Sequence, residues 1–358
     1  MSEERSALKA PFPYFGGKRR VAHVVWARFG NVPNYAEPFF GSGAVLLARP
    51  HAPRVETVND KDCLIANFWR AVQAAPDLVA ENASWPVNEA DLHARHEWIV
   101  ETVDDEWRER MHHDPRFFDA LIASWWLWGL SCWIGGGWCP QTGNLSQKLP
   151  LVGGTGTGVN RAHLAQGIPH ISDQGTGVHA PHLAQSMPMI GGPGQGINRG
   201  ALIEGEGTCA ERLAALKRYF GLLQDRLRNV RVCCGEWDRI LGPSPTHKIG
   251  ITGVFLDPPY GGDEMCEVYS HDSADVASAV RQWCAENGDH PDLRIALCGY
   301  DGEHNALETH GWSVHAWKAT GGWANTGEGQ GQENCRKERI WFSPACREAR
   351  DGLQGSLV

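Results

Sequence analysis

The chain has 358 residues, a formal net charge of −9 and an isoelectric point of about 6.0. This length suits one large domain with an insertion, or two domains, and gives ample chain for a hydrophobic core. The acidic balance excludes a uniform polycation that coats nucleic acid, although a local basic groove can still bind it.

Eleven cysteines raise the question of a metal site or a disulfide framework. None of them forms a C-x-x-C pair, and an odd number cannot complete a set of intramolecular disulfides. The histidine pairs at 93/96 and 112/113 have no acid or thiol at ligand spacing. We therefore expect no metal and mostly buried, reduced thiols, as in a cytoplasmic protein.

Two segments bear on membrane targeting. The start, Met1 to Ala10, is charged and lacks the apolar region of a signal peptide. The run from Ala120 to Ile134 is rich in Trp and Leu but too short and too interrupted to span a bilayer. Both observations favour a cytoplasmic location.

In chain order, the first distinctive segment is Pro11 to Lys18, with the sequence PFPYFGGK. Gly16 and Gly17 let the backbone approach a ligand closely, and Lys18 supplies a cation for a carboxylate. The Tyr14 ring can lie against a flat group. An ordinary N-terminal turn is the alternative. A helix is expected from Arg19 to Phe29.

Residues 34–47, NYAEPFFGSGAVLL, indicate a strand, a Gly-rich turn and a helix. The third glycine of the G-x-G-x-x-G dinucleotide fingerprint is absent. The turn, with Phe39 and Gly41, still offers a cradle of backbone N–H groups for a ligand. Glu37 at the strand end is placed to accept a hydrogen bond from an ammonium group.

The next predicted strand, Val55 to Asp60, ends in an acid. In nucleoside-binding α/β folds an acid at the end of the second strand accepts hydrogen bonds from ribose hydroxyls. The alternative is that Asp60 caps a helix from Lys61 to Val72. The two roles are compatible.

The middle of the chain is mostly helical in pattern. Pro76 to Pro115 is polar with scattered Trp, and Phe117 to Ile134 fits an apolar helix packed in a core. Thr208 to Arg228 predicts an amphipathic helix with exposed cations.

A 19-residue repeat lies between these helices: residues 156–169 recur at 175–188, and a third copy starts at Gly194. The repeat is rich in glycine and short of large apolar residues, so it cannot build a core alone. It is either a surface loop or a DNA-facing extension that carries Lys148, Arg161 and Arg199.

The apolar run Gly253 to Leu256 predicts a buried strand that ends in Asp257-Pro258-Pro259-Tyr260. Open α/β sheets place ligands at this end of their strands. The prolines stiffen the loop and leave the Pro258 carbonyl to accept a hydrogen bond, as does Asp257. Two such acceptors hold the amino group of a planar base, and Tyr260 can stack on its ring. The alternative is a plain Pro-Pro turn.

The remaining elements complete an α/β sheet. Strands are expected at 231–234 and 293–300, a helix at 275–287, and a closing antiparallel hairpin at 312–317 and 338–342. The Gly-rich hairpin loop is followed by Arg336 and Lys337, which suit a phosphate backbone. A solvated loop is the alternative.

The motifs at residues 13–18, 37–45, 59–60 and 257–260 stand in the order seen in the Dam-type, D12 class DNA adenine-N6 methyltransferases, which the chain resembles. The resemblance spans roughly the first 75 residues and those from 230 to 345. It implies S-adenosylmethionine (SAM) as methyl donor, a Rossmann-like sheet, base flipping and an inserted, mostly helical target-recognition domain. No metal is implied.

The resemblance also suggests SAM contacts at Tyr14, Lys18, Asp60 and Asp257. Tyr14 stands where many relatives have Trp, and either ring can stack. The segment from Gly135 to Trp138 resembles a family loop that precedes the DNA-contacting part, so Trp138 is expected to touch DNA.

The expected domains are a catalytic domain in two parts, 8–75 and 230–345, an inserted recognition region at 76–229 with the repeats at about 137–200, and a polar tail at 346–358. The expected function is site-specific methylation of adenine N6 in double-stranded DNA. Alternatives are methylation of cytosine N4 or of adenine in RNA, or a catalytically silent DNA-binding protein of this fold. A monomeric, solitary enzyme, phage-borne or cellular, fits the sequence, as does one paired with a restriction nuclease.

Overall fold

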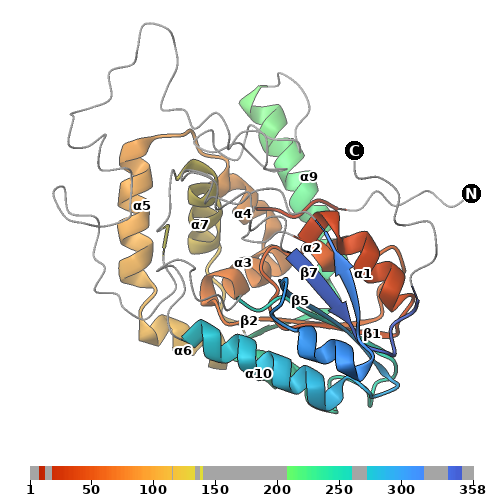
Figure 1. The fold of residues 1–358 in the computed structure, drawn as a ribbon. Helices are drawn as coiled ribbons and strands as arrows, with labels where there is room; N and C mark the ends of the chain where they lie inside the picture. Colours follow the sequence, from red (N-terminus) through yellow and green to blue (C-terminus); the bar gives the residue numbers. More distant parts are fainter. Residues whose placement is uncertain are drawn as a thin grey trace, which may run out of the picture. The chain divides into compact units, whose positions relative to one another are not determined.

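The computed structural model describes residues 8–12, 18–114, 116–133, 138–139, 208–259, 272–317 and 338–348. The chain divides into two compact units, with the main divisions after Lys61 and after Arg228. The sheet unit holds the elements from η1 to β2 and from β3 to β7, and the helical unit holds α3 to α9 with residues 11–13 (Figure 1). The predicted boundary at residue 75 differs from the observed one, because α3 (Cys63–Ala74) is grouped with the helices.

The sheet unit contains a seven-stranded sheet, among the described residues, in the order β3-β2-β1-β4-β5-β7-β6. Only β7 runs antiparallel to its neighbours. The mixed α/β architecture is confirmed, and it is consistent with a methyltransferase fold. The strands are β1 (Asn34–Glu37), β2 (Val55–Asp60), β3 (Val230–Cys234), β4 (Thr252–Leu256), β5 (Leu293–Tyr300), β6 (Ser313–Ala316) and β7 (Glu338–Phe342).

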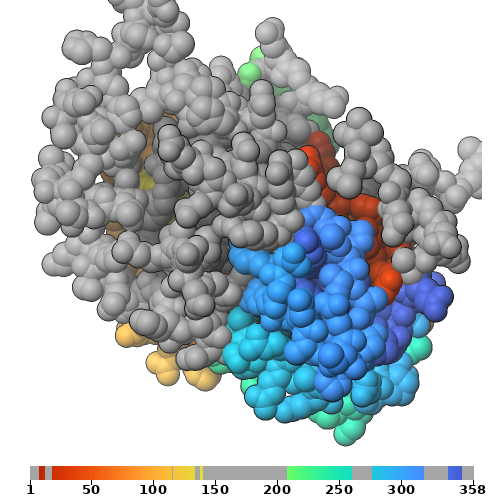
Figure 2. All heavy atoms as spheres, viewed as in Figure 1, coloured from red at the N-terminus to blue at the C-terminus, as the bar shows by residue number. Residues whose placement is uncertain are grey.

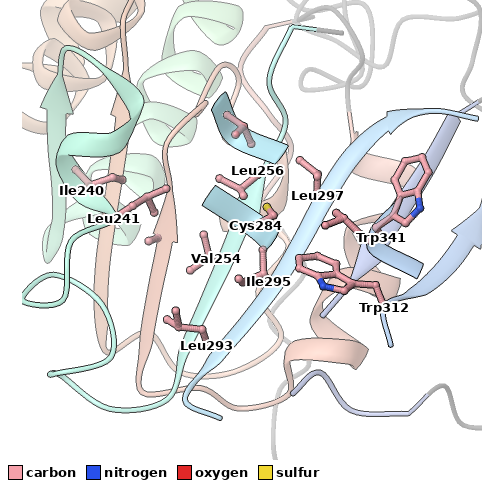
Figure 3. Packing of buried hydrophobic residues seen from close by; sticks show 13 residues of the cluster. Ile240, Leu241, Val254, Leu256, Cys284, Leu293, Ile295, Leu297, Trp312 and Trp341 are labelled. Carbon is pink, nitrogen blue, oxygen red and sulfur yellow. The ribbon is translucent and has the colours of Figure 1, made fainter. Parts of the chain in front are cut away.

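One face of the sheet packs through alternate residues of neighbouring strands. Val254 and Leu256 of β4 point to the same side as Ile295 and Leu297 of β5 (Figure 3). Cys284 of α10 (Asp272–Asn287) joins them, and all five side chains are fully buried. In Figure 2, α10 and the elements that follow it, in cyan and blue, form a continuous outer surface of this unit.

The other face is covered by α1 (Ala22–Phe29). The Trp26 and Phe29 rings of this helix lie 5.0 and 6.3 Å from the Tyr35 ring of β1. Gly253 of β4 leaves the space that Phe29 fills, since a Cβ there would lie 2.8 Å from the Phe29 ring. The sheet is therefore covered by helices on both faces. The short elements of this unit are η1 (Lys18–Arg20), α2 (Ala44–Leu47), η2 (Trp237–Ile240) and η3 (Asn305–His310).

The strand order places the ends of β1 and β4 side by side. The chain runs outward from β1 to β2 and β3, then returns to β4 on the other side of β1. In open α/β sheets this reversal creates a crevice at the carboxyl ends of the strands. Glu37 and Asp257, at the ends of β1 and β4, lie at this point of the sheet.

The helical unit contains the helices predicted at 76–115, 117–134 and 208–228. Its elements are α3, α4 (Pro76–Ala83), α5 (Glu89–Thr102), α6 (Asp105–His113), α7 (Ala120–Cys132) and α9 (Cys209–Leu227). Helix α7 is buried over most of its length, as its apolar sequence predicts. Helix α9 begins with a capping box between Thr208 and Glu211. No described helix has both the length and the apolarity that crossing a membrane requires.

The described cysteines are all free, and seven of these nine thiols are buried. The helix after β2 is capped by Asp62, which accepts a hydrogen bond from the Leu64 N–H at 2.8 Å. The alternative role of Asp60 as that cap is therefore wrong. The physical reason is that α3 begins at Cys63, which places Asp60 inside β2.

Because the Phe29 ring lies close to Gly253, we predict that a methyl group added at residue 253 lowers the stability of the fold. Gly253→Ala should lower the free energy of unfolding by about 1 to 3 kcal/mol, the cost of overpacking a core. Gly242→Ala in the same unit is the control, because its Cβ would meet nothing closer than 4.0 Å. Urea unfolding of both variants checks this, and equal stabilities would contradict the packing described.

Candidate active site

The Lys18 ammonium lies between two carboxylates. Its Nζ is 3.0 Å from Asp257 Oδ1 and 3.6 Å from Glu338 Oε2. The Lys18 and Glu338 side chains are 3% and 7% exposed, and that of Asp257 is 19% exposed. Lys18 comes from η1, Asp257 follows β4, and Glu338 begins β7, so three distant segments meet here.

Burial alone would lower the pKa of Lys18, because it disfavours the charged form. The Asp257 and Glu338 carboxylates outweigh that effect and raise this pKa above its usual value. Lys18 is therefore a fixed positive charge at neutral pH. It was predicted to meet a ligand carboxylate, and that contact stays a prediction, since here its partners are acids of the chain itself.

Glu37 is a buried carboxyl group at the end of β1, with 2% exposure. Burial raises its pKa well above the usual range, and the nearby Asp257 and Asp60 charges raise it further. The Tyr35 hydroxyl donates a hydrogen bond to Glu37 Oε2 at 2.8 Å, which opposes the shift only in part. Glu37 therefore favours its neutral form until a cation arrives beside it.

Asp60 and the glycine turn are joined by a hydrogen bond. The Gly41 N–H donates to Asp60 Oδ2 at 2.8 Å, so the acid at the end of β2 holds the turn after β1. Gly41 and Gly43 have φ of +47° and +67°, a backbone conformation that glycine adopts readily. The Asn59 amide donates to the carbonyls of Pro38 and Gly235 at 3.2 and 2.9 Å, which ties the ends of β1 and β3 together.

The turn after β1 also carries an aromatic pair. Phe39 is stacked with Trp237 of η2, with ring centroids 6.3 Å apart and an angle of 19° between the planes. Both rings are half-buried. The sequence predicted a role for Phe39 but none for Trp237. The position of Trp237, an aromatic residue shortly after a strand that ends beside the site, could have indicated such a role.

Two other neighbours of Asp257 were not predicted. Glu338 begins the predicted hairpin strand, but nothing in the local sequence distinguishes it from other strand acids. Cys298 of β5 is buried, and burial together with its contact to Asp257 raises its pKa well above the usual value. Both residues are identified only by the pairing of β5 with β7, which places them near Asp257.

The other predicted site residues fall into two groups. Trp138 belongs to the helical unit, where its indole N–H donates to the Trp126 carbonyl at 3.0 Å and its ring lies 5.3 Å from those of Trp133 and His96. Its contact with DNA stays a prediction. Pro258 is described and buried. The residues that lie outside the described ranges are Tyr14, Gly17, Lys148, Arg161, Arg199, Tyr260, Arg336 and Lys337.

The raised pKa of Glu37 predicts a pH-dependent stability. Above the ordinary Glu pKa the unfolded chain loses this proton while the folded chain keeps it, so wild-type stability falls as pH rises. Glu37→Gln removes this loss and can still accept from Tyr35. We expect the variant to gain roughly 1 kcal/mol or more over wild type between pH 4 and pH 8, as one unit of pKa shift corresponds to 1.36 kcal/mol.

Urea unfolding of both proteins at several pH values measures this gain. Glu286→Gln, at an exposed position of α10, is the control and should change stability equally at every pH. A gain for Glu37→Gln that does not grow with pH would contradict a neutral, buried Glu37.

A comparison with protein families found one match. The family model of the D12 class N6 adenine-specific DNA methyltransferases matches residues 14–110. The matched part covers about a quarter of the chain. It includes Lys18, Glu37, Gly41 and Asp60, whereas Asp257 lies outside it. A comparison with curated proteins found no match. Over residues 14–110 this chain is similar to the D12 class N6 adenine-specific DNA methyltransferases, a family of enzymes that methylate adenine in DNA.

Proposed function

We propose that the chain is a SAM-dependent methyltransferase that acts on N6 of adenine in double-stranded DNA. The observation that carries the proposal is the set of three acids, Glu37, Asp60 and Asp257, at the carboxyl ends of β1, β2 and β4. Burial and mutual repulsion favour a cationic ligand there. The family match at residues 14–110 supports DNA adenine methylation as the reaction.

The residues present suit SAM, which supplies a methyl group on a positively charged sulfur and also carries an ammonium group. Glu37 would accept from a cation, because an adjacent positive charge offsets the cost of ionising its buried carboxyl group. Asp60, fixed by the Gly41 N–H, would accept from ribose hydroxyls. The Phe39 and Trp237 rings offer a flat apolar surface for a purine.

The acceptors after β4 suit an amine substrate. Asp257 and the Pro258 carbonyl would hold the adenine amine and aim its lone pair, while Tyr260 would stack on the flipped base. The carbon–nitrogen bond forms as the carbon–sulfur bond breaks. The sulfur would keep the electron pair of the broken bond, and N6 would lose one proton to the solvent. Asp257 favours the positive charge that develops on the amine, and positioning supplies much of the rate.

We propose the helical unit and the segment that follows α7 for DNA recognition. Arg218 of α9 and Arg228, which directly follows this helix, are exposed, and cations of this kind bind phosphates. Trp138, the repeat cations Lys148, Arg161 and Arg199, and the pair Arg336 and Lys337 complete this proposal. The recognition sequence, a monomeric state, a cytoplasmic location and any restriction nuclease partner stay predictions.

The alternatives differ in the product they form. Incubation with radiolabelled SAM and either duplex DNA or RNA, followed by digestion and nucleoside analysis, separates adenine N6, cytosine N4 and RNA methylation. A silent DNA-binding protein would bind duplex DNA and yield no methylated base.

We predict that replacement of Asp257 causes loss of methyl transfer. Asp257→Ala should reduce the single-turnover rate by at least roughly 100-fold, the scale seen when a group that stabilises transition-state charge is removed. Asp301→Asn is the control, because this exposed acid pairs with Arg339 on the surface. Methylation by Asp257→Ala within a few-fold of wild type, in a folded protein, would refute the role of Asp257.

Cofactor binding should release a proton. If Glu37 is neutral in the free protein and ionises beside a cation, SAM affinity rises with pH below the raised pKa of Glu37. Calorimetric titration at one pH in buffers of different ionisation enthalpy measures the proton count. Glu37→Gln should bind SAM more weakly and release fewer protons, whereas Glu286→Gln should match wild type. An unchanged proton count in Glu37→Gln would remove Glu37 from the cofactor site.

A further inference from the structure

The Trp317 indole lies close to Asp257 and has no part in the chemistry proposed so far. Its ring centroid is 5.7 Å from the Lys18 Nζ, and the same ammonium lies 3.0 Å from Asp257 Oδ1. Trp317 directly follows β6, and its backbone N–H donates to the Glu338 carbonyl at 3.2 Å. The pairing of β6 with β7 thus holds an aromatic ring near the acid that follows β4.

The indole N–H of Trp317 is buried, and it meets no hydrogen-bond acceptor in the part of the chain that the structure describes. The residue as a whole is half-buried. A buried indole N–H usually finds an acceptor, because an unpaired buried donor lowers stability. An unpaired donor near the reactive centre therefore needs an explanation, and a ligand that supplies the acceptor is one.

The strand order separates Trp317 from the residues proposed for the cofactor. Those residues belong to β1, β2 and the segments that follow β1 and β3, all on one side of β4 in the sheet. Trp317 follows β6, the strand at the other edge of the sheet, beyond β5 and β7. Asp257, at the end of β4, lies between the two groups. The position of Trp317 therefore suits the substrate rather than the cofactor.

We propose that Trp317 binds the target base: its indole N–H donates a hydrogen bond to N1 or N7 of the flipped adenine, the two ring acceptors beside N6. This inference rests on the proposed function. Such a bond lies in the plane of the base, because the lone pairs of ring nitrogens point outward in that plane. It is therefore compatible with the stacking proposed for Tyr260. The Lys18 ammonium, over the face of the indole, helps to keep the ring in place.

Trp26 provides a matched comparison in the same unit. Its ring centroid is 5.1 Å from the guanidinium carbon of Arg49, so it also has a cation over its face. Its indole N–H, however, donates to the Val45 carbonyl at 2.7 Å. Trp26 and Trp317 thus share a cation over the ring and differ in whether the N–H has an acceptor.

The first test removes the N–H and keeps the shape of the ring, with benzothienylalanine, which has sulfur in place of the indole N–H. Trp317→benzothienylalanine should leave the urea midpoint of the free protein unchanged or raise it, because an unpaired donor is removed. The same replacement of Trp26 should lower the midpoint, because it breaks the bond to Val45. Equal losses in both variants would overturn the inference, since the Trp317 N–H would then already be paired.

The second test combines the variant with a changed base. Sequencing of DNA methylated by the wild type first supplies the recognition sequence. Duplexes then carry adenine, 1-deazaadenine or 7-deazaadenine at the target position, and each analogue has C–H in place of one ring nitrogen and keeps N6. On adenine, Trp317→benzothienylalanine should lower the single-turnover rate about 10-fold at saturating SAM and DNA, the scale of one hydrogen bond.

The two analogues should respond differently to this replacement. On the analogue that lacks the contacted nitrogen, wild type and variant should have nearly equal rates, because the hydrogen bond is already absent. On the other analogue, the loss should be as large as on adenine. Trp317→Phe also lacks the N–H and should show the same pattern. Equal losses on all three bases, or no loss on any, would overturn the inference.

Affinity for SAM separates the substrate from the cofactor. Calorimetric titration should give Trp317→benzothienylalanine the SAM affinity of wild type. A loss of SAM affinity as large as the loss of rate would assign Trp317 to the cofactor and overturn the inference. A wild-type protein that methylates no nucleic acid would refute the proposed function, and the role of Trp317 with it. Methylation of adenine with equal losses on all three bases would refute the role of Trp317 alone.

Discussion

The Lys18 ammonium is buried where η1, the end of β4 and the start of β7 meet, and its two carboxylate partners come from the second half of the chain. Removal of the cation would leave Asp257 and Glu338 close together in a site with little water. Removing one partner of a buried ion pair is among the most destabilising changes in proteins. The N-terminal segment is thus held to the sheet by the same contact that orients the acid after β4.

The remaining acids at the sheet edge form a second electrostatic system. Glu37, Asp60 and Asp257 lie at the ends of three neighbouring strands. Burial raises the pKa of Glu37, and the Asp257 and Asp60 charges raise it further, so Glu37 favours its neutral form. A structure selected only for stability would not gather acids in this way. In the free protein, the repulsion among these acids lowers stability. When a positively charged ligand binds, burial strengthens its attraction to the same acids, and this favours binding.

Much of this arrangement is readable in the sequence, since β4 is an apolar run that ends in Asp257 and β2 ends in Asp60. The apolar run at 253–256 predicted a buried strand, and every residue of β4 is buried. What escaped prediction depends on contacts between distant segments. By residue type Asp60 and Asp62 are equally suited to cap a helix. Their hydrogen bonds distinguish them, because Asp62 accepts from the Leu64 N–H of α3 and Asp60 accepts from the Gly41 N–H. Glu338 and Trp237 look ordinary until strand pairing brings them to the site.

The same limit explains the boundary between the two units. The sequence of α3 has the pattern of an ordinary amphipathic helix that follows a strand. For this reason we predicted that it belongs to the domain that contains the sheet. Its buried face includes Phe68 and Trp69, which pack on Phe12 and, through Phe68, on Phe220 of α9. The hydrophobic periodicity of α3 indicates which face of the helix is buried. It does not indicate which distant residues cover that face.

The connection between β2 and β3 has a consequence for synthesis on the ribosome. These strands are parallel neighbours in the sheet, yet residues 61–229 separate them along the chain. The other neighbour of β1 is β4. β1 therefore cannot be paired along both of its edges until most of the chain has been synthesised. Pairings this distant are slow because loop closure must come first. During this interval the exposed backbone of β1 and β2 is a risk for aggregation, and prior folding of the helical segment would shorten the distance that β3 has to search.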